Sequence, residues 1–593
     1  MNFLRNFFAS FLAVIAALVI GLPILMGIVI GIFASIGESQ DRVEVKPNTV
    51  LTLNLSGPIV EKGSDYPYSF DINPFSGNVA KKTGLFELTR KIDQAQKDDN
   101  IKGIYLKLEG GVGTGWANLS TIREKLVDFK ASGKFIYAYA EIYDERSYYL
   151  ASTADKVFMP KVGMLEFNGL ESVPMFYADM FKKIGVKPEI FRVGTFKSAV
   201  EPFLRTDMSE PSKQQTRALL SDVWDVFLSD ISASRGIPKD QLDHIAANFM
   251  IGNAAEALKA GLIDEVAYEH TVLDALKEAT GKESDEKLTT LSMKKFMKVP
   301  GTYNSSRNKI AVVFAEGGIN SGKSTEGSIG SETIVKALRK AREDDNVKAV
   351  VLRINSPGGS ALASDMIAEE VRLTGLEKPI VASMGNVAAS GGYYIAAKCD
   401  KIFAQENTIT GSIGIFSILF DAQNLMNQKI GLTFDAVETH EHANLYNPGM
   451  PMSPAVKKFF QANVEKGYGT FIEVVREGRG FADSLAVDKV GQGRVWSGRA
   501  AQGIELVDEY GNLETAISYV AEEAGLGDDF KIKTLPEEKD PFEALLNDMV
   551  GSAKQSISEE HPLYQELQTI KEIKQTLPGS GTYMLMPYQF EIR

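Results

Sequence analysis

Residues 344–359 read DDNVKAVVLRINSPGG, and this stretch decides the fold class. The run Ala349–Ile354 is apolar except for Arg353. A nearly continuous apolar run of this length is typical of a strand that is buried on both faces of a parallel sheet. The turn formers Ser356-Pro357-Gly358-Gly359 follow and end the strand.

A helix is expected directly after this turn. Ser360 can accept a hydrogen bond from the first helical turn as an N-cap. Apolar residues then recur at helical spacing, at Leu362, Met366, Ile367 and Val371. The next strand is expected at Pro379–Met384, with another helix starting near Ser390. Repeated strand-loop-helix units predict an α/β fold with a mainly parallel sheet.

The same landmarks occur twice, about 245 residues apart, which indicates a duplicated domain instead of a short solenoid repeat. The paired landmarks are 98–103 with 344–349, Tyr148-Tyr149 with Tyr393-Tyr394, Asp155–Phe158 with Asp400–Phe403, and 260–265 with 502–509. The expected organisation is a membrane anchor at 1–45, a first repeat at 46–280, a linker at 281–308, a second repeat at 309–535 and an unassigned tail at 536–593.

The N-terminal segment predicts a single transmembrane helix. Residues 6–37 carry no charge, and this exceeds the ~20 residues that a helix needs to cross a bilayer. Arg5 precedes the run and acidic residues follow it, so the bulk of the chain is expected outside the cytoplasm. A long signal peptide cleaved near 34–37 is the alternative.

Composition excludes several classes of function. The net charge of −13 argues against a general nucleic-acid partner. Cys399 is the only cysteine, and it is expected to be a packed core residue. A single cysteine rules out an intrachain disulfide and a multi-cysteine zinc site, and no phosphate-binding loop occurs. No metal and no cofactor are therefore expected.

Ser390 is the candidate nucleophile. It lies at a predicted strand-to-helix junction, with small residues before it and Gly391-Gly392 after it. In the first repeat, Glu145 stands opposite Ser390 although the surrounding pattern persists. A residue needed for folding alone would be expected in both copies, so this asymmetry points to chemistry in the second. The loop Asn355–Gly359 can supply backbone N–H donors for an oxyanion.

These motifs resemble signal peptide peptidase A, or protease IV, in its long duplicated bacterial form. The matching segments are Asn355–Gly359, Ala389–Ala396, 194–199 and 410–414. The resemblance implies two tandem domains with a fold similar to the Clp protease and the crotonases, and a Ser/Lys dyad. It implies the following roles: Ser390 as nucleophile, Lys197 as general base, Ser412 as a hydrogen-bond partner of the lysine, and Gly358, Gly359 and Gly391 as oxyanion donors.

The residues themselves agree with a lysine base. Five histidines occur, and none has a recognisable catalytic context; His440 and His442 lie opposite the Lys197 segment and stay under suspicion. A solvated lysine of pKa ~10.4 is rarely neutral at pH 7, but burial can lower that pKa by up to ~3–5 units.

The resemblance further implies a serine endopeptidase of the bacterial inner membrane, with its catalytic part on the periplasmic side. Its substrates would be signal peptide remnants and other apolar peptides, and it would assemble as a homotetramer. Two alternatives stay open: acyl-thioester chemistry on a crotonase-like fold, and an inactive peptide-binding scaffold.

Overall fold

The computed structural model describes residues 43–63, 82–301, 304–325, 327–537 and 581–585. The predicted transmembrane helix falls almost wholly outside these ranges, so nothing here bears on it. Among the described helices, none combines the length and the apolar character that crossing a bilayer requires.

The first repeat forms a parallel sheet with the strand order β11-β8-β6-β4-β1-β12. Its strands are β1 (Thr49–Asn54), β4 (Ile101–Lys107), β6 (Phe135–Tyr139), β8 (Lys156–Met159), β11 (Glu265–Val266) and β12 (Thr290–Ser292). The segment 281–308, expected as a linker, thus contributes the edge strand β12 to this sheet.

The second repeat builds the same sheet, with parallel neighbours in the order β23-β19-β18-β16-β13-β24. These strands are β13 (Lys309–Glu316), β16 (Val347–Ser356), β18 (Ile380–Ala389), β19 (Lys401–Ala404), β23 (Glu509–Tyr510) and β24 (Lys531–Leu535). Beyond the end of β19, β18 also pairs with β20 (Ile409–Gly411), which pairs antiparallel with β22 (Val495–Ser497).

Equivalent side chains make equivalent contacts in the two repeats. The Tyr148 hydroxyl donates to Leu262 O at 2.6 Å, and the Tyr393 hydroxyl donates to Leu506 O at 2.9 Å. Likewise, Asp155 accepts from Ile136 N near the start of β6, and Asp400 accepts from Ile380 N at the start of β18, both at 2.8 Å. The predicted α/β class and its mainly parallel sheets are confirmed.

A third sheet joins the repeats, with the order β10-β21-β25-β17-β14-β15. In it, β10 of the first repeat runs antiparallel to β21 of the second over seven residue pairs. Its strands are β10 (Lys187–Val193), β14 (Gly318–Asn320), β15 (Ser328–Gly330), β17 (Gly358–Ser360), β21 (Ile415–Asp421) and β25 (Gly581–Leu585). Through β10 the chain of the first repeat enters a sheet of the second repeat, and Lys197 follows β10 four residues later.

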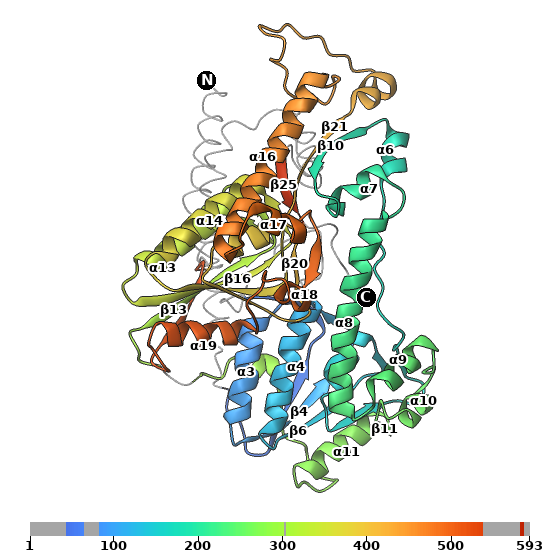
Figure 1. Cartoon of the computed structure of the whole chain (residues 1–593). Coiled ribbons are helices and arrows are strands. Elements are labelled where there is room, and N and C mark those ends of the chain that lie inside the picture. Colours follow the sequence, from blue (N-terminus) through green and yellow to red (C-terminus); the bar gives the residue numbers. More distant parts are fainter. Residues whose placement is uncertain (1–42, 64–81, 302–303, 326, 538–580, 586–593) are drawn as a thin grey trace, which may run out of the picture.

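Helices cover both faces of the second sheet (Figure 1): α13 and α14 lie on one face and α19 on the other, toward α3 and α4 of the first repeat. The long helix α8 extends from the first repeat to β22. Among the helices that connect these strands are α3 (Leu85–Lys97), α4 (Trp116–Ala131), α5 (Glu145–Ala151), α6 (Ala178–Ile184), α7 (Glu201–Leu204), α8 (Glu210–Arg235), α13 (Ser331–Glu343), α14 (Ala361–Gly375), α15 (Gly391–Ala396), α16 (Pro454–Arg479) and α19 (Leu513–Glu523).

Further helices and strands occur in both repeats. They are β2 (Gly57–Val60), β3 (Thr83–Gly84), β5 (Val112–Gly113), β7 (Ile142–Tyr143), β9 (Met164–Leu165), α9 (Lys239–Ala247), α10 (Ala254–Lys259), α11 (Glu269–Ala279), α12 (Met293–Phe296), α17 (Ser484–Val490) and α18 (Gly498–Gln502).

The local predictions hold in part. Ser360 caps α14 by accepting from Ala363 N, as expected, and Cys399 is buried. The predicted apolar face of α14 is half wrong, because Leu362 and Met366 are exposed. The buried face is formed by Ala363, Ile367, Ala368 and Val371. Small alanines in place of the two larger residues let the helix pack closely against its neighbours.

Candidate active site

Ser390 lies on the sharp turn between β18 and α15. Its backbone has φ 55° and ψ −116°, a conformation that a residue with a Cβ rarely adopts. Two hydrogen bonds hold the turn: Ser390 N donates to Gly411 O at 2.8 Å, and Tyr394 N donates to Ser390 O at 2.9 Å. Backbone strain kept at a buried serine is a feature of functional sites.

Lys197 reaches this serine from the other repeat. Its Nζ lies 2.8 Å from Ser390 Oγ, 3.0 Å from Ser412 Oγ and 3.1 Å from Ser412 O. The lysine is completely buried, and its three partners are uncharged. Burial therefore lowers the pKa of Lys197 well below its usual value. The lowered pKa favours the neutral, proton-accepting form of the amine.

A loop at 491–494, which the sequence analysis did not single out, holds the lysine segment in place. Phe196 N donates to Gln492 O at 2.9 Å, which fixes the residue before the lysine. Gly493 has φ +75° and lies so close that a Cβ there would come 2.6 Å from Lys197 Cβ. The only sequence signal was a pair of glycines around Gln492, and such pairs are common in ordinary turns.

Gln215 on α8 braces the same segment from the opposite side. Its Nε2 donates to Phe196 O at 3.1 Å and to Ser198 Oγ at 2.8 Å. Its Oε1 accepts from Val495 N of β22 at 3.2 Å. One buried amide thus ties the lysine turn to the second repeat.

The three expected oxyanion glycines lie together. Gly391 packs directly on the turn of β17, since a Cβ on it would come 3.2 Å from both Gly358 Cα and Gly359 N. Gly358 has φ +100°, and Gly358 N donates to Ser356 Oγ at 3.1 Å. Gly391 is the first residue of α15, where N–H groups have no partner within the helix. Three glycine backbones thus lie together beside Ser390.

A strand of the chain itself runs through this region. β25 pairs antiparallel with β17 on one side (Gly358 with Leu585, Ser360 with Tyr583) and with β21 on the other. It lies in the sheet position next to the glycines that flank Ser390. An extended peptide placed there would gain main-chain hydrogen bonds from both neighbours.

In the described part of the first repeat, the position equivalent to Ser390 holds a carboxylate instead of a hydroxyl. Glu145, opposite Ser390, is buried and accepts from Asn168 N at 3.0 Å, so it supports a loop. His440 and His442 are both exposed in a loop between β21 and α16, and neither has a hydrogen bond to Ser390. Burial raises the pKa of Glu145, which fits a structural carboxyl.

This arrangement suits acyl transfer: a hydroxyl, a buried amine of lowered pKa within hydrogen-bond distance, and three glycine backbones beside them. The profile of peptidase family S49 matches residues 128–283 and again 373–527, together more than half of the chain.

Curated proteins of similar length are alike over most of the chain. Protease 4 of Haemophilus influenzae is 38% identical over 482 residues, covering 79% of this chain and 78% of that protein. Protease 4 of Salmonella typhi is 34% identical over 523 residues, covering 86% and 84%. Among solved structures, ClpP1 from Listeria monocytogenes aligns at 16% identity with a TM-score of 0.23, covering 35% of this chain and 94% of that one.

Proposed function

Because the chain belongs to peptidase family S49 and is a serine endopeptidase, we propose that it cuts peptide bonds with a dyad of Ser390 and Lys197. The observation that carries this proposal is the 2.8 Å separation of Lys197 Nζ and Ser390 Oγ in a buried setting. Membership in this family also speaks against the acyl-thioester and inactive-scaffold alternatives.

The reaction proceeds in two acyl-transfer halves. Ser390 Oγ attacks the scissile carbonyl carbon while its proton passes to the neutral Lys197 amine, and Ser412 Oγ keeps that amine oriented. Backbone N–H groups of Gly359 and Gly391, with Gly358 beside them, stabilise the oxyanion. The lysine ammonium then protonates the leaving amine. Water, deprotonated by the same lysine, finally hydrolyses the acyl-enzyme.

The substrates are cleaved signal peptides and other apolar peptides, bound as extended strands in the position of β25. An apolar border supports this preference. Leu362 and Met366 lie one turn apart on α14 and are exposed, and α14 contacts β25. They offer exposed apolar surface on a helix that contacts the strand position proposed for the peptide.

The protein is held in the bacterial inner membrane by its N-terminal segment, with the catalytic part on the periplasmic side, and it acts as a homotetramer. The uncharged run at 6–37 supports the anchor. The anchor would keep the site near the membrane in which apolar peptides accumulate.

Peptide preference tests the proposed substrate class. Fluorogenic peptides with apolar residues around the scissile bond are expected to give kcat/KM values at least about tenfold above those of acidic peptides of equal length, because burying each apolar side chain adds about 1.5–3 kcal/mol. Equal kcat/KM for both sets would refute the apolar preference but leave the dyad standing. Coenzyme A thioesters serve as the negative control.

Removal of the C-terminal strand is expected to raise activity. If β25 occupies the strand position between β17 and β21 about nine-tenths of the time, deleting residues 581–593 raises the apparent kcat/KM roughly tenfold, because the fraction of enzyme open to substrate grows by that factor. A synthetic peptide of residues 576–593 should then inhibit the shortened enzyme competitively. An unchanged kcat/KM together with no inhibition would show that β25 does not compete with substrate.

A further inference from the structure

A buried ion pair joins the two repeats close to the site. Glu61, which follows β2 of the first repeat, lies 2.8 Å from Arg353 Nε on β16, and both side chains are 2% exposed. Arg353 is the charged residue that interrupts an otherwise apolar strand. A buried pair of this kind gains little net stability, because desolvation offsets the attraction. Its position therefore calls for another explanation.

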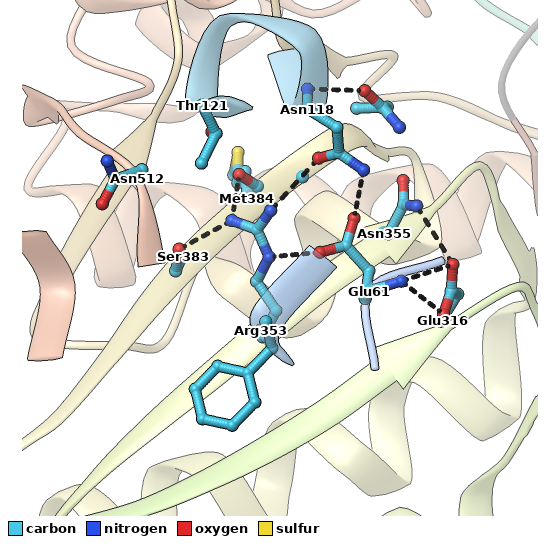
Figure 2. A network of polar contacts seen from close by, with 12 residues as sticks. Glu61, Asn118, Thr121, Glu316, Arg353, Asn355, Ser383, Met384 and Asn512 are labelled. Atoms are coloured by element: carbon cyan, nitrogen blue, oxygen red, sulfur yellow. Dashed lines mark hydrogen bonds and ion pairs between the residues drawn. The ribbon is translucent and has the colours of Figure 1, made fainter. Parts of the chain in front are cut away.

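Arg353 uses its other donors on neighbouring segments (Figure 2). Its second terminal nitrogen donates to Asn118 Oδ1 at 3.3 Å, and the first donates to Ser383 Oγ at 2.9 Å and Met384 O at 2.8 Å. Asn118 Nδ2 donates at 3.0 Å to Glu61 Oε1, the carboxylate oxygen that does not pair with Arg353 Nε. We call Glu61, Asn118 and Arg353 the repeat clamp.

The clamp lies against a bulge in the strand that carries Ser390. The β16–β18 register runs from Ile354 opposite Met384 to Ser356 opposite Ala388. One residue of β16, Asn355, therefore faces the three residues 385–387 of β18. Bulges of this kind often re-aim side chains beside active sites.

The first repeat contacts two of these three bulge residues. Asn118 N donates to Asn386 Oδ1 at 3.0 Å, and Asn386 Nδ2 donates to Thr114 Oγ1 at 3.3 Å. Gly385 packs so closely on Glu61 that a Cβ would come 2.5 Å from its carboxylate. The bulge ends three residues before Ser390.

The third bulge residue is tied to the oxyanion loop. Val387 N donates to Asn355 Oδ1 at 3.1 Å, and Asn355 begins the loop that leads to Gly358. Glu316 accepts from Glu61 N at 3.1 Å and lies 3.5 Å from Asn355 Nδ2 (Figure 2). Burial and the Glu61 carboxylate raise the pKa of Glu316 to about 7, so it is ionised and accepts both donors in alkaline solution.

We propose that Glu61, Asn118 and Arg353 are positioning residues of the reaction: through them the first repeat fixes the bulge in β18, and with it the Ser390 hydroxyl and the oxyanion loop. This inference rests on the proposed Ser/Lys chemistry. The first repeat thus contributes twice, with the base Lys197 and with the alignment of the nucleophile that the base must reach.

The test compares Glu61→Gln and Asn386→Ala with wild type. Glu61→Gln keeps the size of the side chain and removes its charge. Asn386→Ala removes the uncharged hydrogen bonds that the bulge makes with Asn118 and Thr114. It therefore tests the proposal even if Glu61→Gln, which changes a buried charge, fails to fold. Both are expected to lower kcat by roughly 10–100-fold with KM within about twofold, because small misplacements of reacting groups cost rate more than binding. Labelling of Ser390 by a serine-directed phosphonate should slow in parallel.

Glu370→Gln is the matched control. Glu370 is a 3%-exposed carboxylate that pairs with Arg342 and Arg339 between α13 and α14. It should lower the Tm without changing kcat. The positioning role is refuted if Glu61→Gln and Asn386→Ala have the same kcat as Glu370→Gln, or if they change only KM. Ser390→Ala in the same assay separates the two claims. If Ser390→Ala still cleaves peptide, the proposed dyad is refuted. If Ser390→Ala is inactive while Glu61→Gln and Asn386→Ala keep the wild-type kcat, only the positioning role of the repeat clamp is refuted.

Discussion

Ser390→Ala is expected to lower kcat for peptide hydrolysis by about 10⁴-fold or more, with the fold retained. In the proposed mechanism Ser390 Oγ forms the acyl bond, and a hydrogen bond joins it to the Lys197 amine. Two other hydroxyls lie beside the glycines: Ser356 Oγ accepts from Gly358 N at 3.1 Å, and Ser364 Oγ packs against Gly391, but Ser390 is the one bonded to the lysine. The measurement is turnover of an apolar fluorogenic peptide.

Ser390→Gly provides a matched control for this variant. Both substitutions remove the hydroxyl, but glycine also removes the Cβ that strains the backbone at φ 55°. Relief of about 1–3 kcal/mol should outweigh the entropic cost of glycine, about 0.5–1 kcal/mol. Ser390→Gly should therefore unfold at a higher temperature than Ser390→Ala while being equally inactive. Measurable turnover by either variant would contradict the role of Ser390.

Lys197→Met is expected to lower kcat by about 10²–10⁴-fold, the usual contribution of a general base. Methionine fills nearly the same buried space but accepts no proton. The double variant with Ser390→Ala should be no slower than Ser390→Ala alone, because residues that act as one unit are not additive. A loss of less than about tenfold in Lys197→Met would exclude the lysine as the base.

The same variant should be more stable than wild type. Since the folded state holds the pKa of Lys197 below its value in the unfolded chain, the stability of wild type falls as pH drops from the usual lysine range toward the lowered pKa. Lys197→Met lacks this titration, so its Tm should exceed that of wild type at neutral pH. Thermal unfolding at pH 7 and pH 10 measures the difference, which should shrink at pH 10.

The strand-turn-helix units followed from local sequence because each carries its own signal. The run before Asn355 is apolar over a strand length, and Ser360 caps the helix as its hydroxyl predicts. The spacing of the repeated landmarks gave the duplication without any further information. Strands, helix caps and repeats depend on residues that are close together in the chain, so a local sequence pattern predicts them.

The meeting of Lys197 and Ser390 could be expected only from the resemblance to a known family. The two residues are 193 apart in the chain, and the exchange of β10 into the sheet of the second repeat brings them together. Antiparallel pairing of β10 with β21 depends on partners far away in sequence, so no local pattern shows it. The repeat clamp escaped prediction for the same reason, although Arg353 stood out in its strand.

The packing face of α14 shows another limit. Leu362 and Met366 lie one turn apart and form a convincing apolar pair, yet they are exposed, while two alanines are buried. Alanine carries little hydrophobic signal, and single apolar side chains are common on a folded surface, so the larger pair did not mark the buried face. Apolar periodicity alone cannot separate these two uses.

The pH dependence of phosphonate labelling at Ser390 tests most directly whether a neutral lysine of the first repeat activates the serine of the second. Below its lowered pKa, Lys197 carries a proton and cannot accept another, so labelling should be slow in acid. It should rise to a plateau well below the ordinary lysine pKa of ~10.4, and Lys197→Met should remove both the rise and the plateau. A wild-type rate that is flat across this range, or a profile that Lys197→Met leaves unchanged, would contradict the account.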